Sequence, residues 1–191
     1  MVKHFALFCT LIIMGCTSTD QPVIDSELWK FEAKNNNLAI DEACEPILNN
    51  YLDLMTALHH QDTSYLVQKA TILISLTDSL QNTTILKDTL LQQNFRNGLL
   101  TFQSELNALI LEKTVQEIAF SANMVSLQLL NLLGNVGYQK QTIYIFNGVG
   151  IEGIGAEDGL TWLALSKKSI NPYQTQKNEF VAAQKVLQEI N

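Results

Sequence analysis

The stretch that decides the fold is residues 115–136, which read VQEIAFSANMVSLQLLNLLGNV. Its apolar side chains recur at steps of three and four residues, the spacing of one face of an α-helix. These side chains are Val115, Ile118, Ala119, Ala122, Val125, Leu129, Leu132, Leu133 and Val136. Gly134 and Gly137 then provide signals that end a helix. The stretch is therefore predicted to be a helix with one buried face.

Three earlier stretches carry the same helical spacing. The first contains Ile40, Cys44, Ile47, Leu48, Tyr51, Leu54, Met55 and Leu58. The second follows a capping-type Asp62-Thr63-Ser64 start and contains Leu66, Ala70, Leu73, Thr77 and Leu80. The third begins near Asn82-Thr83-Thr84, has a weak point at Gly98, and contains Leu91, Phe95, Leu99, Phe102, Leu106 and Leu109. Because the connections are short, we expect an antiparallel four-helix bundle.

The character of the chain changes after Tyr138. Residues 142–146 (TIYIF) are β-branched and aromatic, which predicts a short strand, and Asn147-Gly148 is a turn signal. A last helix is predicted from Phe180, Ala183, Gln184, Leu187 and Ile190. The expected fold class is mainly α: an antiparallel four-helix bundle with a short β/loop segment and a C-terminal helix.

Residues 1–15 have the form of a secretory signal. Lys3 and His4 give a basic start, and the apolar run that follows is too short to cross a bilayer as a helix. Ile13-Met14-Gly15-Cys16 resembles a lipobox, the bacterial lipoprotein processing motif, with Cys16 as the acylated residue. An ordinary signal peptide with an incidental cysteine is the alternative. We expect residues 1–15 to be the signal peptide, 16–38 the lipidated cysteine and its tether, and 39–191 the helical-bundle domain.

This interpretation places the mature protein in the cell envelope, lipid-anchored to a bacterial membrane and facing the periplasm or the cell surface. Lys3 is the only charged residue of the signal, so the mature chain keeps 11 basic and 19 acidic residues and a net charge of −8. An acidic surface argues against nucleic acid as a partner. The expected partners are the membrane, through the lipid, and a protein of the cell envelope.

The sequence offers two candidate reactive sites, a thiol at Cys44 and a metal site around Met55. Cys44 is the only cysteine left after lipidation of Cys16, and its place on an apolar helix face predicts a small buried hydrophobe rather than a reactive thiol. Met55, His59 and His60 could hold a metal through thioether and imidazole ligands. The alternative puts Met55 in the core and both histidines at a helix C-terminus, which favours cations. We favour the latter and expect no resident metal.

No catalytic constellation is present. Residues 148–153 match the spacing of a dinucleotide fingerprint, but no helix pattern begins there, and Glu152, Glu157 and Asp158 would repel phosphate. These carboxylates also lack the ordered spacing of a calcium loop. We therefore expect a protein that is not an enzyme and carries no cofactor. Trp162 and Tyr173 are expected to clamp loops onto the bundle rather than line a ligand pocket.

Several short segments together resemble a helical periplasmic domain of unknown function. They are Tyr51–Leu58, the Ile143-Tyr144 strand, Trp162-Leu163 and Ile170-Asn171-Pro172-Tyr173, in the family's order and with similar spacing. That family occurs alone and appended to adaptor subunits of copper and heavy-metal efflux systems. The resemblance covers about residues 40–190 and implies an extracytoplasmic accessory domain.

The departures from that family concern its metal ligands. Its Cys-Pro-Met element after the strand, and its Met and Cys-Gly after Asn-Pro-Tyr, have no counterpart here, and Phe180 and Ala183 stand near the second position. Ala164 also replaces the usual Ser. We therefore expect a non-catalytic binding or accessory lipoprotein that lacks the family's sulfur ligands. The alternative is a copper-type chaperone or buffer with a displaced site at Met55, His59 and His60.

Overall fold

The computed structural model describes residues 38–148, 159–174, 180–183 and 185–186, all within the compact unit 31–191. This part is mainly helical, as the sequence predicts. It contains the helices α1 (Leu38–His59), α2 (Thr63–Gln81), α3 (Thr89–Leu111) and α4 (Val115–Val136). The short strands are β1 (Tyr144–Gly148), β2 (Leu160–Ala164), β3 (Lys168–Ile170), β4 (Phe180–Ala182) and β5 (Lys185–Val186).

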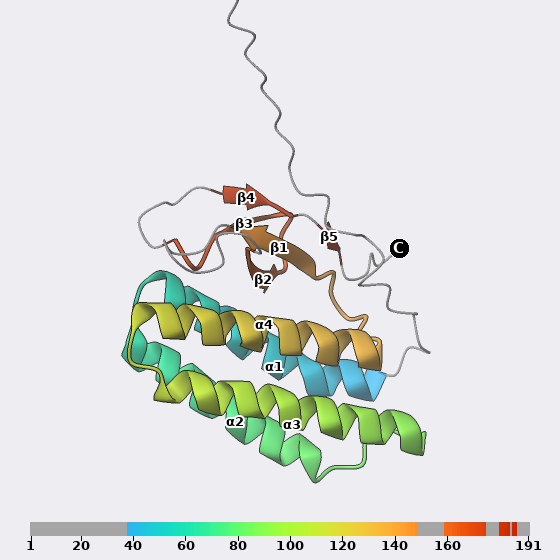
Figure 1. Ribbon diagram of the computed structural model, residues 1–191. Coiled ribbons are helices and arrows are strands. Elements are labelled where there is room, and N and C mark those ends of the chain that lie inside the picture. The colour runs from blue at the N-terminus through green and yellow to red at the C-terminus, as the bar shows by residue number, and fades with distance from the viewer. Residues whose placement is uncertain (1–37, 149–158, 175–179, 184, 187–191) are drawn as a thin grey trace, which may run out of the picture. The chain divides into compact units, whose positions relative to one another are not determined.

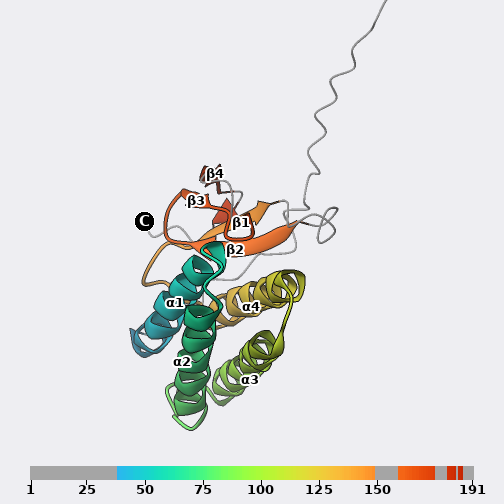
Figure 2. The same ribbon diagram turned by 90° about the vertical axis from the view of Figure 1, so that its left-hand side faces the viewer.

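The helices and strands of this unit lie in layers. Each helix packs on the next in sequence, and β2 contacts α1 and α4, so the strands cover these two helices on the side away from α2 and α3 (Figures 1 and 2). Most of each predicted helix face is buried, with Phe95, Phe102 and Leu129 at 0% exposure, but Val115 at the start of α4 is 48% exposed. At Gly98 a Cβ would lie 2.8 Å from Leu132 Cδ1, so the missing side chain lets α3 approach α4 closely.

Short polar side chains begin three of the helices. Asp62 caps α2, as the sequence predicts, by accepting the Tyr65 N–H at 2.9 Å. Thr114 begins α4 in a capping box, in which its hydroxyl accepts from the Glu117 N–H and the Glu117 carboxylate accepts from the Thr114 N–H. These bonds satisfy backbone donors that have no partner within the helix.

The predicted start of the third helix is wrong by about one and a half turns. It begins at Thr89 with Asp88 as its cap, not near Asn82. Within the connection, Gln92 Oε1 accepts from the N–H groups of Ile85 and Leu86, at 3.0 and 2.8 Å. The Gln92 side chain, six and seven residues downstream, therefore provides the hydrogen bonds that these two backbone N–H groups would otherwise make within a helix. No local sequence pattern predicts this arrangement.

The first sheet has the order β2-β1-β5, and β2 is its edge toward the helices. The backbone N–H and C=O groups at the edge of a sheet have no strand to pair with, so they need other hydrogen-bond partners when they are buried. The Thr161 N–H donates to Asn123 Oδ1 at 2.8 Å, and the Leu163 N–H donates to the Tyr51 phenol oxygen at 3.0 Å. Side chains from α4 and α1 thus complete the edge of β2.

Two sequence predictions in this region are wrong. Asn147 and Gly148 do not turn the chain, because they continue β1 and pair with Thr161 and Leu160. The predicted C-terminal helix is also absent from residues 180–183 and 185–186, which instead form β4, paired with β3, and β5, paired with β1. An isolated helix of about eleven residues is marginal in water, so neighbouring strand edges decide the conformation.

Among the residues described, no helix is long and apolar enough to span a membrane. Residues 1–37, which hold the predicted signal and Cys16, lie outside them.

The phenol of Tyr51 gives a direct test of how the two layers are joined. Tyr51 is fully buried, so Tyr51→Phe leaves the Leu163 N–H and the Ser126 hydroxyl with one partner fewer each. We expect a loss of about 1–3 kcal/mol in the free energy of unfolding, measured by urea denaturation. Tyr144→Phe is the matched control, because its phenol makes no hydrogen bond within the described residues. Equal losses for both variants would contradict this role of Tyr51.

Candidate functional site

A hollow of about 640 Å³ lies between the C-terminal end of α1 and the segment from β2 to β4. Its volume falls in the range of about 300–1,000 Å³ that small-molecule sites occupy. It is lined by Leu52, Met55, Thr56, His59, His60, Trp162, Leu163, Ala164, Leu165, Ser166, Lys168, Ser169, Ile170, Pro172 and Phe180.

The end of α1 supplies one wall and brings together the three residues of the predicted alternative metal site. Met55 is 5% exposed and belongs to the core, as expected. His59 is half-buried and His60 is exposed, with their ring centroids 5.2 Å apart in an edge-to-face arrangement. α1 ends at His59 and His60 follows it, and the chain then turns at Gln61, which takes a left-handed conformation with φ of 54°.

The opposite wall rests on a cluster of aromatic rings. Trp162, 1% exposed, stacks on Phe146 at 5.2 Å between centroids and meets Tyr173 edge-on at 6.2 Å. Its indole N–H donates to Ser169 Oγ at 3.1 Å, which ties β2 to β3. Trp162 and Tyr173 are thus both buried, and the contacts of Trp162 join β1, β2, β3 and the segment after β3 to one another; Trp162 also lines the hollow.

The Asn171-Pro172-Tyr173 segment is locked onto β2. Asn171 Oδ1 accepts the Tyr173 N–H at 2.9 Å, and the Tyr173 phenol donates to the Thr161 carbonyl at 2.7 Å. Burial raises the pKa of Tyr173 well above its ordinary value, so the phenol remains a donor at neutral pH. A Cβ at Gly148 would lie 2.7 Å from Asn171 Nδ2 and 3.0 Å from the Trp162 ring. Glycine at this position is therefore required for the close packing.

The polar side chains that line the hollow carry hydroxyl, imidazole and ammonium groups. Among the described residues of the lining, Lys168 is the only lysine or arginine, and none is an aspartate or glutamate. Ser169 Oγ is already engaged, since it accepts from Trp162 and donates to the Ile170 carbonyl. Ser166 Oγ accepts a hydrogen bond from the Lys168 N–H at 3.4 Å, and its own hydroxyl proton remains available for donation to a ligand. The described residues of the hollow can therefore offer hydrogen-bond donors and a positive charge.

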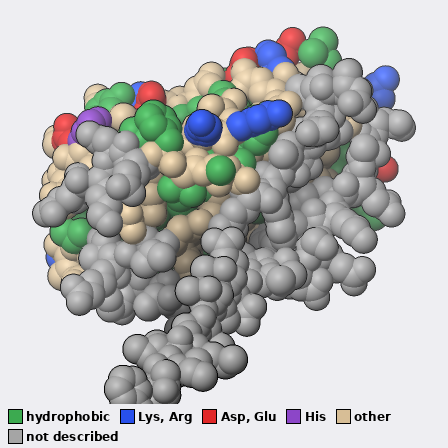
Figure 3. Space-filling view, turned by 90° about the horizontal axis from the view of Figure 1, so that it is seen from above, with side chains coloured by type: hydrophobic (Ala, Val, Ile, Leu, Met, Phe, Trp, Pro, Cys, Tyr) green, Lys and Arg blue, Asp and Glu red, His purple; other side chains and the backbone are tan. Residues whose placement is uncertain are grey.

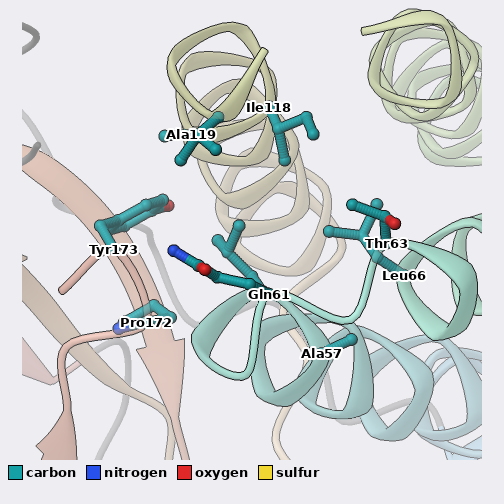
Figure 4. A pocket seen from close by; sticks show the side chains of 10 residues that line it. Ala57, Gln61, Thr63, Leu66, Ile118, Ala119, Pro172 and Tyr173 are labelled. Atoms are coloured by element: carbon teal, nitrogen blue, oxygen red, sulfur yellow. The ribbon is translucent and has the colours of Figure 1, made fainter. Parts of the chain in front are cut away.

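A second, much smaller cavity of about 40 Å³ lies where α1 ends and where α2 and α4 begin. Figure 4 shows Pro172 and Tyr173 facing Ala57, Leu66 and Ala119 across it. It is too small for a metabolite, and we interpret it as imperfect packing.

Cys44 lies away from both cavities and is 0% exposed, which confirms its prediction as a buried hydrophobe. Burial, assisted by the nearby charge of Asp41, raises the pKa of the thiol to about 12. The thiolate is the nucleophilic form of cysteine. Cys44 is therefore protonated at neutral pH and is inert as a nucleophile.

Other predicted residues fall outside the described part of the chain. These are Cys16, the glycine-rich stretch 149–158, and with it Glu152, Glu157 and Asp158. Within the described ranges, no group of three or more His, Cys, Asp or Glu side chains could hold a metal ion. Sequence reasoning missed that Lys168 and Phe180 line the same hollow as His60; the available signals were the Lys167-Lys168 pair and the place of Phe180 near one of the family's ligand positions.

Comparison with known proteins gives no relative: no protein family, curated protein or solved structure matches the chain.

Truncation of Trp162 tests whether the aromatic cluster supports this site. Trp162→Ala should lower the free energy of unfolding by about 3–5 kcal/mol, because it opens a cavity in a closely packed wall. Trp162→Phe loses the hydrogen bond to Ser169 but keeps an aromatic ring against Phe146. Because that ring is kept, this variant should lower the free energy of unfolding by less than Trp162→Ala does. Thermal and chemical denaturation measure both. Phe120→Ala, at a side chain 56% exposed, is the control. A Trp162→Ala protein as stable as the wild type would contradict the clamp.

Proposed function

We propose that this protein is a non-catalytic binding or accessory module, built on an antiparallel four-helix bundle and held in the bacterial cell envelope by a lipid on Cys16. The hollow beside the end of α1 is the observation that carries the binding role. It combines a wall fixed by Trp162 and Tyr173 with an open rim, where Phe180 is 67% exposed. A rigid wall suits binding, because little conformational entropy is lost when a ligand docks on it.

The chemistry of the hollow favours binding over catalysis. A general acid or base and a nucleophile must lie within hydrogen-bond reach of each other. Ser169 donates its hydroxyl proton to the Ile170 carbonyl, and none of the described residues that line the hollow is an aspartate or glutamate. Cys44, buried and protonated, is not available as a nucleophile.

The resemblance to the efflux-associated domain supports the same proposal. The segments that carry it meet in one place, since Tyr51 contacts Leu163, and Trp162 contacts Tyr173. Phe180, near one of the family's ligand positions, lines the hollow. In this proposal the scaffold and the position of its binding surface are retained, while an apolar side chain replaces a sulfur ligand.

Lipid labelling tests the anchor. Bacteria that express the full chain and are fed radioactive palmitate should incorporate label into the protein, which should sediment with membranes. Cys16→Ser should lose both the label and the membrane association, because several acyl chains supply the stable attachment. Cys9→Ser, a cysteine lost with the signal, should keep both. Wild-type protein without label would refute the anchor.

A metal-binding role is the second candidate, because Met55, His59 and His60 share the wall of the hollow. Titration of residues 17–191 with Cu(I) and Zn(II) separates the two roles. The leading proposal expects no stoichiometric binding at micromolar metal. Tight binding that Met55→Ala/His59→Ala abolishes, and that the control Met124→Ala preserves, would establish a displaced soft-ligand site instead.

A further inference from the structure

We propose that the hollow binds a long-chain carboxylate, with Lys168 at the head group and the apolar side chains of the rim along the hydrocarbon chain. This inference deepens the proposed function, because it takes the same hollow as the binding surface and names the class of its ligand.

Charge selects an anion. The chain contains 19 acidic and 12 basic residues, yet among the described residues of the lining Lys168 is the only one that is Lys, Arg, Asp or Glu. Elsewhere Lys69 and Lys140 are each paired with a carboxylate, at 2.6 Å from Asp53 and Glu45 respectively. Lys168 makes no such pair within the described residues. The hollow therefore presents a positive charge that an anionic head group can neutralise.

Neighbouring donors fit a carboxylate. Ser166 Oγ accepts the Lys168 backbone N–H and keeps its hydroxyl proton, which can be donated to a carboxylate oxygen. His60, exposed beside the hollow, adds a ring nitrogen. An ammonium group binds as a compact point charge, so a single carboxylate is sufficient to pair it.

Exposed apolar side chains require that the anion also carry a hydrocarbon part. Phe180 is 67% exposed and Leu165 38% exposed, and both line the hollow. Covering them removes apolar surface from water, whereas a small inorganic anion would leave both wet. On this side of the molecule hydrophobic and basic side chains lie next to one another, while acidic ones appear at the margin (Figure 3). An uncharged hydrocarbon would cover these side chains but would not pair with the ammonium group of Lys168.

Isothermal titration of the mature chain, residues 16–191 with Cys16→Ser to exclude the lipid, tests the proposal. Dodecanoate, kept below its critical micelle concentration, should bind one to one and more tightly than dodecanol, its uncharged counterpart. Lys168→Gln should weaken dodecanoate binding about tenfold, as expected for loss of a charge-assisted bond, and leave dodecanol unchanged. Lys167→Gln removes the same charge at a neighbour that does not line the hollow, so it should have little effect.

A second pair of variants tests the apolar half. Phe180→Ala should weaken the binding of dodecanoate and of dodecanol alike. Phe120→Ala, at a side chain of α4 that is 56% exposed against 67% for Phe180, should change neither. Circular dichroism confirms that each variant is folded. Absent dodecanoate binding, equal affinity for dodecanol, or equal effects of the two lysine variants would each overturn the proposal.

The same chemistry could be presented by an anionic membrane surface. Sedimentation with phosphatidylcholine vesicles, with and without phosphatidylglycerol, distinguishes this source. Lys168-dependent binding to the anionic vesicles, without binding of monomeric dodecanoate, would assign the charge to a head-group surface and overturn the hydrocarbon site. If the chain is lipidated but binds no dodecanoate, the proposed ligand class is wrong and the lipid anchor stands. If it binds dodecanoate but is not lipidated, the proposed anchor is wrong and the ligand class stands.

Discussion

The phenol of Tyr51 is the contact through which the helices hold the strands. It is fully buried, accepts the Leu163 N–H of β2 at 3.0 Å, and lies 2.8 Å from Ser126 Oγ of α4. Ser126 donates its hydroxyl proton to the Ala122 carbonyl. In its contact with Tyr51, Ser126 Oγ is therefore the acceptor and the Tyr51 hydroxyl is the donor. One oxygen thus joins α1, α4 and β2. Because an unpaired buried donor is costly, this contact fixes where β2 can lie.

From this fixed strand the rest of the β region follows. Once β2 is placed, Trp162 points between Phe146 and Tyr173, and the Tyr173 phenol returns to the Thr161 carbonyl. Gly148 permits the close approach that this arrangement needs. The wall of the hollow is therefore set by packing and hydrogen bonds that do not depend on a ligand, which is the physical basis for interpreting it as a preformed binding surface.

The chemistry of that surface is as restricted as its geometry. Its described residues supply one ammonium group without a described carboxylate partner, two imidazoles and several apolar side chains, and none of them is an aspartate or glutamate. Two candidate nucleophiles of the chain are engaged or protonated: Ser169 in the lining and Cys44 away from it. The proposed recognition of an amphipathic anion uses the ammonium group and the apolar side chains together.

The sequence by itself determined the four helices, the cap at Asp62 and the burial of Cys44 and Trp162, because helical periodicity and capping depend on residues within a few positions of each other. Only the tertiary structure decided that Phe180 begins a strand and that Asn147-Gly148 continues one, since pairing partners come from distant segments. It alone also placed Lys168 and Phe180 in the lining of the same hollow as His59 and His60. Local pattern cannot encode that neighbourhood, because it exists only after β2 docks on Tyr51 and the strands fold back along the helix end.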